Sequence, residues 1–129
     1  MIKLKLNHDC VRDLLLAVED IPSLTGWYSI PQLMKNENLK DKHYSIDEIA
    51  YTATCLGDAG FIKTDPNNRE PEYYTIQRMT WNGHAFLDDI RDPKVWKKTK
   101  EIASNLASVS VKSLFEISTN LARKYVGLD

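Results

Sequence analysis

The sequence predicts a mainly helical fold with one small antiparallel sheet, and three observations support this. The chain has 129 residues, 43% of them hydrophobic and 27% charged, which suits one globular domain with a modest core. Several segments repeat apolar residues at helical spacing behind a capping residue. Two short segments rich in β-forming residues flank a Pro and Asn turn. Helices packed around one β-hairpin are therefore expected.

The first helix is predicted over residues 8–20. Asn7 is a suitable N-cap, and Asp9 lies in the first turn, where the helix dipole favours an acid. The apolar positions that recur at helical spacing are Val11, Leu14, Leu15 and Val18. A short strand is expected at residues 27–30, before Pro31. Residues 31–43 are ambiguous, because a short helix around Leu33 competes with asparagines that favour early fraying.

The next helix has the clearest start in the chain. Ser45 and Glu48 form a capping box, and Tyr44 stands at the spacing of a hydrophobic staple with Ile49. Its apolar stripe is Ile46, Ile49, Ala50, Ala53 and Leu56. Gly60 suits a left-handed residue after the last turn, so the helix is expected to end near residue 59.

A β-hairpin and three further helices complete the pattern. Strands are predicted over residues 61–64 and 73–80, with a turn at 65–68. Thr80 caps a helix whose buried stripe is Phe86, Leu87 and Ile90. Asp92 followed by Pro93 starts another helix. After a serine-rich break at 108–110, a last helix runs to Gly127, and these two helices are expected to form a C-terminal hairpin.

This order of elements is that of a winged helix-turn-helix, in which a helical core carries a small β wing. We expect a winged-helix domain over residues 1–91. Residues 92–129 are expected to form a helical hairpin that packs on the same core or on a dimer partner. The dimer contacts expected on its apolar stripe are Val111, Leu114, Phe115 and Leu121.

Several segments resemble one known family. They are Leu6 to Asp9, Tyr44 to Ser45, Asp58 to Gly60 and above all Trp81 to Arg91, which reads WNGHAFLDDIR. They are similar to a bacterial and prophage family of unknown function, number twenty-five thirteen, over nearly the whole chain. The resemblance implies a winged-helix protein of bacterial or phage origin. It brings no reaction, ligand or functional residue with it.

DNA binding is the function that the fold suggests, but the charges oppose it. The second helix of such a motif must offer Arg, Lys, Asn or Gln to the major groove. The exposed positions expected here are instead Asp47, Glu48, Tyr51, Thr52, Cys55 and Asp58. Contacts to DNA or to a partner are therefore sought elsewhere, at Lys63, Arg69 and Arg78 in or beside the wing and at Lys97, Lys98 and Lys100.

The formal net charge is −1, which gives no bulk attraction to nucleic acid. Residues 1–91 hold 10 basic and 14 acidic residues, and residues 92–129 hold 7 and 4, so the halves carry −4 and +3. Two hypotheses follow. The chain is a DNA-binding regulator, by analogy with its fold, or it is a protein-interaction module that uses the winged-helix fold without nucleic acid.

Other functions are not expected. The sequence has no nucleophile with a base and no phosphate loop, so no enzyme, cofactor or metal site is predicted. Cys10 and Cys55 are expected to be buried thiols. No signal segment or membrane span is apparent, which favours a cytoplasmic protein. Trp27, Trp81 and Trp96 are expected in the core, and Gly83 is expected to permit close approach of another element.

Overall fold

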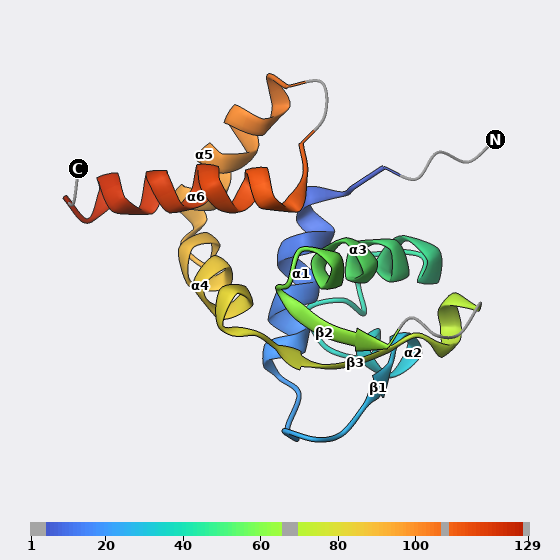
Figure 1. Ribbon diagram of the computed structural model, residues 1–129. Coiled ribbons are helices and arrows are strands. Elements are labelled where there is room, and N and C mark those ends of the chain that lie inside the picture. Colours follow the sequence, from blue (N-terminus) through green and yellow to red (C-terminus); the bar gives the residue numbers. More distant parts are fainter. Residues whose placement is uncertain (1–4, 66–69, 107–108, 128–129) are drawn as a thin grey trace.

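The computed structural model describes residues 5–65, 70–106 and 109–127. The prediction of a mainly helical chain with a small antiparallel sheet is confirmed. The sheet lies at one end of the molecule and the last two helices at the other, with α1, α3 and α4 between them (Figure 1). The elements are, in order, α1 (His8–Glu19), β1 (Tyr28–Ser29), α2 (Ile30–Leu33), α3 (Ile46–Asp58), β2 (Ile62–Asp65), the 3-10 helix η1 (Pro71–Tyr73), β3 (Thr75–Met79), α4 (Trp81–Ile90), α5 (Pro93–Ser104) and α6 (Val111–Tyr125).

The starts of α1 and α3 are tied to each other by their capping residues. Asn7 caps α1, where its Oδ1 accepts from the Cys10 N–H at 3.2 Å, and Ser45 caps α3 by accepting from the Glu48 N–H at 3.0 Å. The predicted capping box is only half formed. The Glu48 carboxylate accepts instead from Asn7 Nδ2 at 3.3 Å, so it links the two helices.

The end of α3 leads directly into the sheet. Gly60 has a φ of 83°, and the Phe61 N–H donates to the Leu56 carbonyl at 2.9 Å, as expected for a left-handed helix end. β2 then pairs with β3, and β1 pairs with the other side of β3, all antiparallel. A register shift between Lys63 and Thr64 leaves Gln77 without a partner on β2. The turn predicted at residues 65–68 lies mostly outside the described residues.

The ambiguous segment after the first strand contains a short helix that starts earlier than expected. Ser29 and Gln32 form a capping box, and Pro31 lies in the first turn of α2. Ile30, predicted to end the strand, is therefore the first residue of the helix, and it is buried. Leu39 is also buried and anchors the turns that follow.

The start of α4 packs against the end of α3 through Gly83. A Cβ atom at Gly83 would lie 2.0 Å from the backbone oxygen of Phe61, far inside any allowed contact. The same oxygen accepts from the Thr80 N–H at 3.0 Å, and the Thr80 hydroxyl caps α4. The prediction that Gly83 permits close approach is confirmed.

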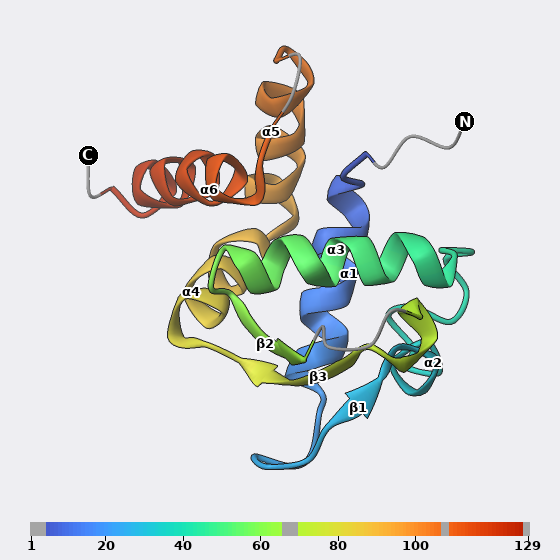
Figure 2. The ribbon, with the colours of Figure 1, turned by 45° about the vertical axis from the view of Figure 1, so that its right-hand side comes forward.

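The C-terminal helices belong to the same core as the rest of the chain. Phe115 of α6 packs against Phe61 and Phe86, with ring centroids 5.3 and 5.7 Å apart. Both predicted helices are present, but they cross steeply instead of running antiparallel (Figure 2). The reason is that α6 contacts α4 as well as α5, so it lies across the molecule. We call α5 and α6 the C-terminal helix pair.

One of the three tryptophans is in the core. Trp96 is 6% exposed and its Nε1 donates to Asp9 Oδ1 at 3.2 Å. Trp27 and Trp81 are 48% and 85% exposed, so placing them in the core was wrong. Trp81 is the first residue of α4 and lies about 140° around the helix axis from the buried Phe86. In the described ranges, no helix combines the length and the apolar character that a membrane span needs.

Candidate functional site

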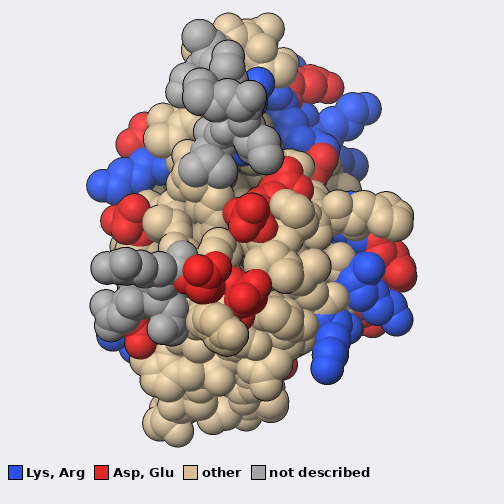
Figure 3. Space-filling view, turned by 90° about the vertical axis from the view of Figure 1, so that its right-hand side faces the viewer, with Lys and Arg blue, Asp and Glu red and all other residues tan. Residues whose placement is uncertain are grey.

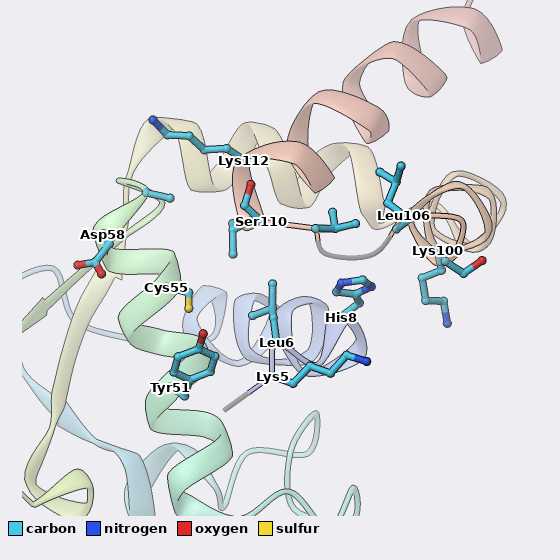
Figure 4. A pocket seen from close by; sticks show the side chains of 15 residues that line it. Lys5, Leu6, His8, Tyr51, Cys55, Asp58, Lys100, Leu106, Ser110 and Lys112 are labelled. Atoms are coloured by element: carbon cyan, nitrogen blue, oxygen red, sulfur yellow. The ribbon is translucent and has the colours of Figure 1, made fainter. Parts of the chain in front are cut away.

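A groove of about 1070 Å³ runs between α3, the start of α1 and the C-terminal helix pair (Figure 4). Three separate parts of the chain supply its walls, and they come together only through the core packing described above. We call it the α3 groove. The residues that line it are Lys5, Leu6, His8, Tyr51, Cys55, Asp58, Ala59, Lys100, Ala103, Ser104, Leu106, Val109, Ser110, Val111 and Lys112.

The first wall is the outer face of α3. Tyr51, Cys55 and Asp58 are spaced by four and three residues, which places them on one side of the helix. This is the face that the sequence predicts to be exposed, with one correction. Thr52 is 1% exposed, and its hydroxyl donates to the Glu48 carbonyl at 2.8 Å, because it lies on the side of α3 that packs against α1.

The second wall comes from the end of α5 and the start of α6. Leu106 is 53% exposed, and Val109 is half-buried against the core. Leu6, just before α1, lies in the middle of the groove between Cys55 and His8 (Figure 4). The centre of the α3 groove is therefore apolar.

Basic side chains border this apolar centre. Lys5 and Lys112 are both exposed and lie at opposite ends of the groove (Figure 4). Lys100 is held in place, because its Nζ lies 2.9 Å from Asp9 Oδ1 and 5.5 Å from the centre of the Trp96 ring. Burial lowers the pKa of His8, and the charges of Lys5 and Lys100 lower it further against the opposing effect of Asp9.

The contact between Lys100 and Asp9 also affects the carboxylate. Burial alone would raise the pKa of Asp9, but the hydrogen bonds from Lys100 and Trp96, together with nearby positive charge, lower it. Lys100, one of the cations predicted to contact DNA or a partner, is thus paired with an acid of the same chain. Lys98 pairs with Glu101 at 3.6 Å within its own helix, and Lys97 is exposed.

Acidic side chains lie along α3 and beside it. Asp47, Glu48 and Asp58 belong to this helix, and Glu72 lies in η1, which packs against it. On the face shown in Figure 3, red side chains gather toward the middle and blue ones toward the edges. The outer face of α3 and the neighbouring η1 are therefore acidic.

The basic residues predicted to contact DNA do not converge. Lys63 is exposed and directly opposite Arg78 in the sheet, while Arg78 donates to the Met79 carbonyl at 3.0 Å. Arg69 lies outside the described residues. The strands that carry Lys63 and Arg78 lie at the opposite end of the molecule from α5, which carries Lys97, Lys98 and Lys100 (Figures 1 and 2). They form no single patch.

Most residues of the predicted dimer stripe are buried in the chain's own core. Val111 and Leu114 are 4% and 0% exposed, and Phe115 packs in the aromatic cluster with Phe61 and Phe86. Leu121 is half-buried, and Tyr125 beyond it is 57% exposed. Dimerisation stays a prediction. The side chains of α6 that are open to a partner chain include Leu121 and Tyr125.

The two thiols differ in their surroundings. Cys10 is fully buried, and burial raises its pKa to about 12, so the prediction of a buried thiol is confirmed for this residue. Cys55 is only half-buried, in the wall of the α3 groove. Among the described side chains, no three metal-ligating groups come together.

Sequence reasoning missed the groove residues Lys5, Leu6 and Lys112. Lys5 and Lys112 are distant in sequence, and no local pattern relates them. They border one groove because the core packing brings the start of α6 beside the end of α3 and the segment before α1.

These features define a mainly helical protein with a three-stranded antiparallel sheet and an open, basic-edged groove. The chain belongs to the family of hypothetical proteins DUF2513, which it matches over residues 5–110. The family resemblance predicted from the sequence is thus confirmed. The match includes α1 to α5 and stops just before α6.

The chain is also similar to an individual bacterial protein. An uncharacterized protein of Haemophilus influenzae (strain KW20) is 27% identical over an alignment of 122 residues, and the alignment covers 92% of this chain and 95% of the relative. The similarity thus extends over nearly the full length of both proteins. No solved structure matches the chain.

Proposed function

We propose that this chain is a winged-helix protein that binds another protein through the α3 groove and does not read duplex DNA through α3. The winged-helix assignment rests on the order of α1, β1, α2, α3 and the β2–β3 hairpin, which follows that fold. The binding role rests on one observation. The outer face of α3 is a wall of a groove, and its charged side chains are acids.

The chemistry of that face is unsuited to DNA. A recognition helix needs donors for base edges and cations for phosphates. Asp47 and Asp58 are exposed on α3 and would repel a polyanion, while Tyr51 and Cys55 face the groove. The C-terminal helix pair stands over the last turns of α3 (Figure 2), and the end of α5 and the start of α6 share a groove with Tyr51, Cys55 and Asp58 of α3.

The same surface suits a protein partner. Protein interfaces combine an apolar centre with a polar rim, and grooves between helices often receive a segment of the partner chain. Leu6, Val109 and Leu106 supply the apolar centre here, and Lys5 and Lys112 supply charged ends.

A duplex titration tests this proposal. A labelled non-specific duplex is titrated with protein up to about 100 µM, at about 20 mM and then about 150 mM salt, and anisotropy is recorded. We expect no binding at either salt concentration. Binding that falls steeply with salt, and that strengthens when Asp47 and Asp58 are changed to Asn, would overturn the proposal, because it would place the duplex on α3.

One observation favours the second candidate function, DNA binding through the wing. Lys63 and Arg78 are paired in the register of β2 and β3, and like charges in that position destabilise a sheet. A phosphate bound beside both side chains would relieve this repulsion. The same titration separates this candidate. If the duplex binds the wild type and not the variant Lys63→Gln with Arg78→Gln, the regulator hypothesis holds and the wing is its contact.

A further inference from the structure

The α3 groove leaves apolar side chains open to solvent between two lysines. Leu106 is 53% exposed, and Leu6 and Val109 are half-buried next to it. At the two ends of the groove stand Lys5 and Lys112, for which the described part of the chain supplies no ion pair. An apolar surface with charged ends is a pattern typical of binding sites.

The charges that line the groove indicate which charge its occupant carries. Lys100 is neutralised by Asp9. Among the described lining residues, Lys5 and Lys112 therefore carry the remaining positive charge, and Asp58 carries the negative charge. His8 contributes little near neutral pH, because burial lowers its pKa. An occupant with carboxylates at its ends complements Lys5 and Lys112, whereas a basic occupant would meet like charge.

The size and shape of the groove favour a polypeptide. Pockets for small molecules measure about 300 to 1000 Å³ and enclose most of the ligand. This groove is as large as the upper end of that range, is open to solvent and is bounded by three parts of the chain. We infer that the α3 groove binds a short segment of a partner protein that carries apolar residues flanked by Asp or Glu. This inference rests on the proposed function, because it specifies the residue types that the partner protein presents to the groove.

A designed peptide serves as the probe. It is rhodamine-labelled, about twelve residues long, and alternates leucine with glutamate. Two control peptides carry lysine at each glutamate or serine at each leucine. Anisotropy titrations with the full chain at about 50 mM salt should show binding of the leucine-glutamate peptide, with each control at least about tenfold weaker.

Matched protein variants locate the site. Lys5→Glu with Lys112→Glu reverses both groove charges, and Lys94→Glu with Lys97→Glu makes the same charge change on α5 outside the groove. The first pair should weaken binding of the acidic peptide at least about tenfold, and the second less than about twofold. Leu106→Ser should weaken it about threefold or more, and because Leu106 is exposed the fold is little affected.

Several results would overturn the inference. They are equal binding of the acidic and basic peptides, equal binding of the serine peptide, or equal weakening by both pairs of variants. Self-association of the chain that is lost in the Lys5 and Lys112 variant would mean that the occupant is a second copy.

Failure of this inference can be told apart from failure of the proposed function. If neither the peptide nor a duplex binds, the inferred partner chemistry is wrong, while the claim that α3 does not read DNA stands. If the duplex binds in a way that depends on Asp47 and Asp58, the proposed function fails whatever the peptide does.

Discussion

The carbonyl oxygen of Phe61 lies 2.0 Å from the point where Gly83 would carry a Cβ atom. This contact joins the end of α3 to the start of α4 and fixes the surface on which Phe115 and α6 pack. Because the oxygen belongs to the backbone and also accepts from the Thr80 N–H, it cannot move aside at low cost. The placement of the groove's second wall, formed by the end of α5 and the start of α6, therefore depends on a residue without a side chain.

Gly83→Ala should lower the free energy of unfolding by more than about 3 kcal/mol, because the added methyl group forces apart two packed backbone segments. Urea denaturation followed by circular dichroism measures the change. The control is Asn82→Ala, at the exposed neighbouring position, which should change stability by less than about 0.5 kcal/mol. Equal effects of the two substitutions would show that the close approach is absent.

The Asp9 carboxylate should stabilise the fold in a pH-dependent way. Its pKa is lowered in the folded state, so its contribution is present above the ordinary pKa of an aspartate and is lost as the pH falls through the lowered value. Asp9→Asn should cost about 0.5 to 1 kcal/mol at neutral pH, since the side chain is more than half exposed, and nothing in strong acid.

Urea denaturation at a series of pH values measures this, with the exposed Asp41→Asn as control. A difference between wild type and Asp9→Asn that persists unchanged in strong acid would contradict the assignment to charge.

Asp89 should behave in the opposite sense. Burial raises its pKa, and a hydrogen bond donated by the Thr119 hydroxyl at 3.0 Å only partly offsets this. A carboxyl whose pKa is raised on folding loses stability as the pH rises through the range between its unfolded and folded pKa values. Asp89→Asn keeps an acceptor for Thr119 and should gain a few tenths of a kcal/mol at pH 7. A loss of stability at pH 7 would contradict this assignment.

Substitution of Trp96 should destabilise the fold far more than substitution of Trp81. Trp96→Ala removes a buried ring and its hydrogen bond to Asp9, and should cost about 3 to 5 kcal/mol. Trp81→Ala changes a side chain that is 85% exposed and should cost less than about 0.5 kcal/mol. Thermal unfolding of both variants measures this. A large loss for Trp81→Ala would mean that this ring is covered, for instance by a second chain.

The sequence predicts well wherever a local rule governs the structure. The caps at Asn7, Ser45, Thr80 and Asp92, and the left-handed residue Gly60, place helix boundaries to within one or two residues. The close approach at Gly83 could be predicted because glycine in a first helical turn lowers helix stability and therefore needs a structural reason. These signals act over at most a few residues, so tertiary packing seldom overrides them.

Predictions that depend on the relative placement of helices were less successful. A hairpin of α5 and α6 was predicted, but the two helices cross. Val111 and Leu114 were predicted to contact a dimer partner, but they are buried, because α6 packs on α4. Periodicity shows that a stripe is apolar and does not show which surface covers it. The same limit hid the α3 groove, whose walls lie far apart in sequence.

The most direct test of the account is chemical-shift mapping on the ¹⁵N-labelled full chain. Backbone amide shifts are followed during titration with the leucine-glutamate peptide and, separately, with a non-specific duplex at about 20 mM salt. We predict that the peptide moves the amides of Leu6, Cys55 and Val111 and that the duplex moves none of the amides of α3. Duplex-induced shifts along α3, with no peptide-induced shifts in the groove, would contradict the account.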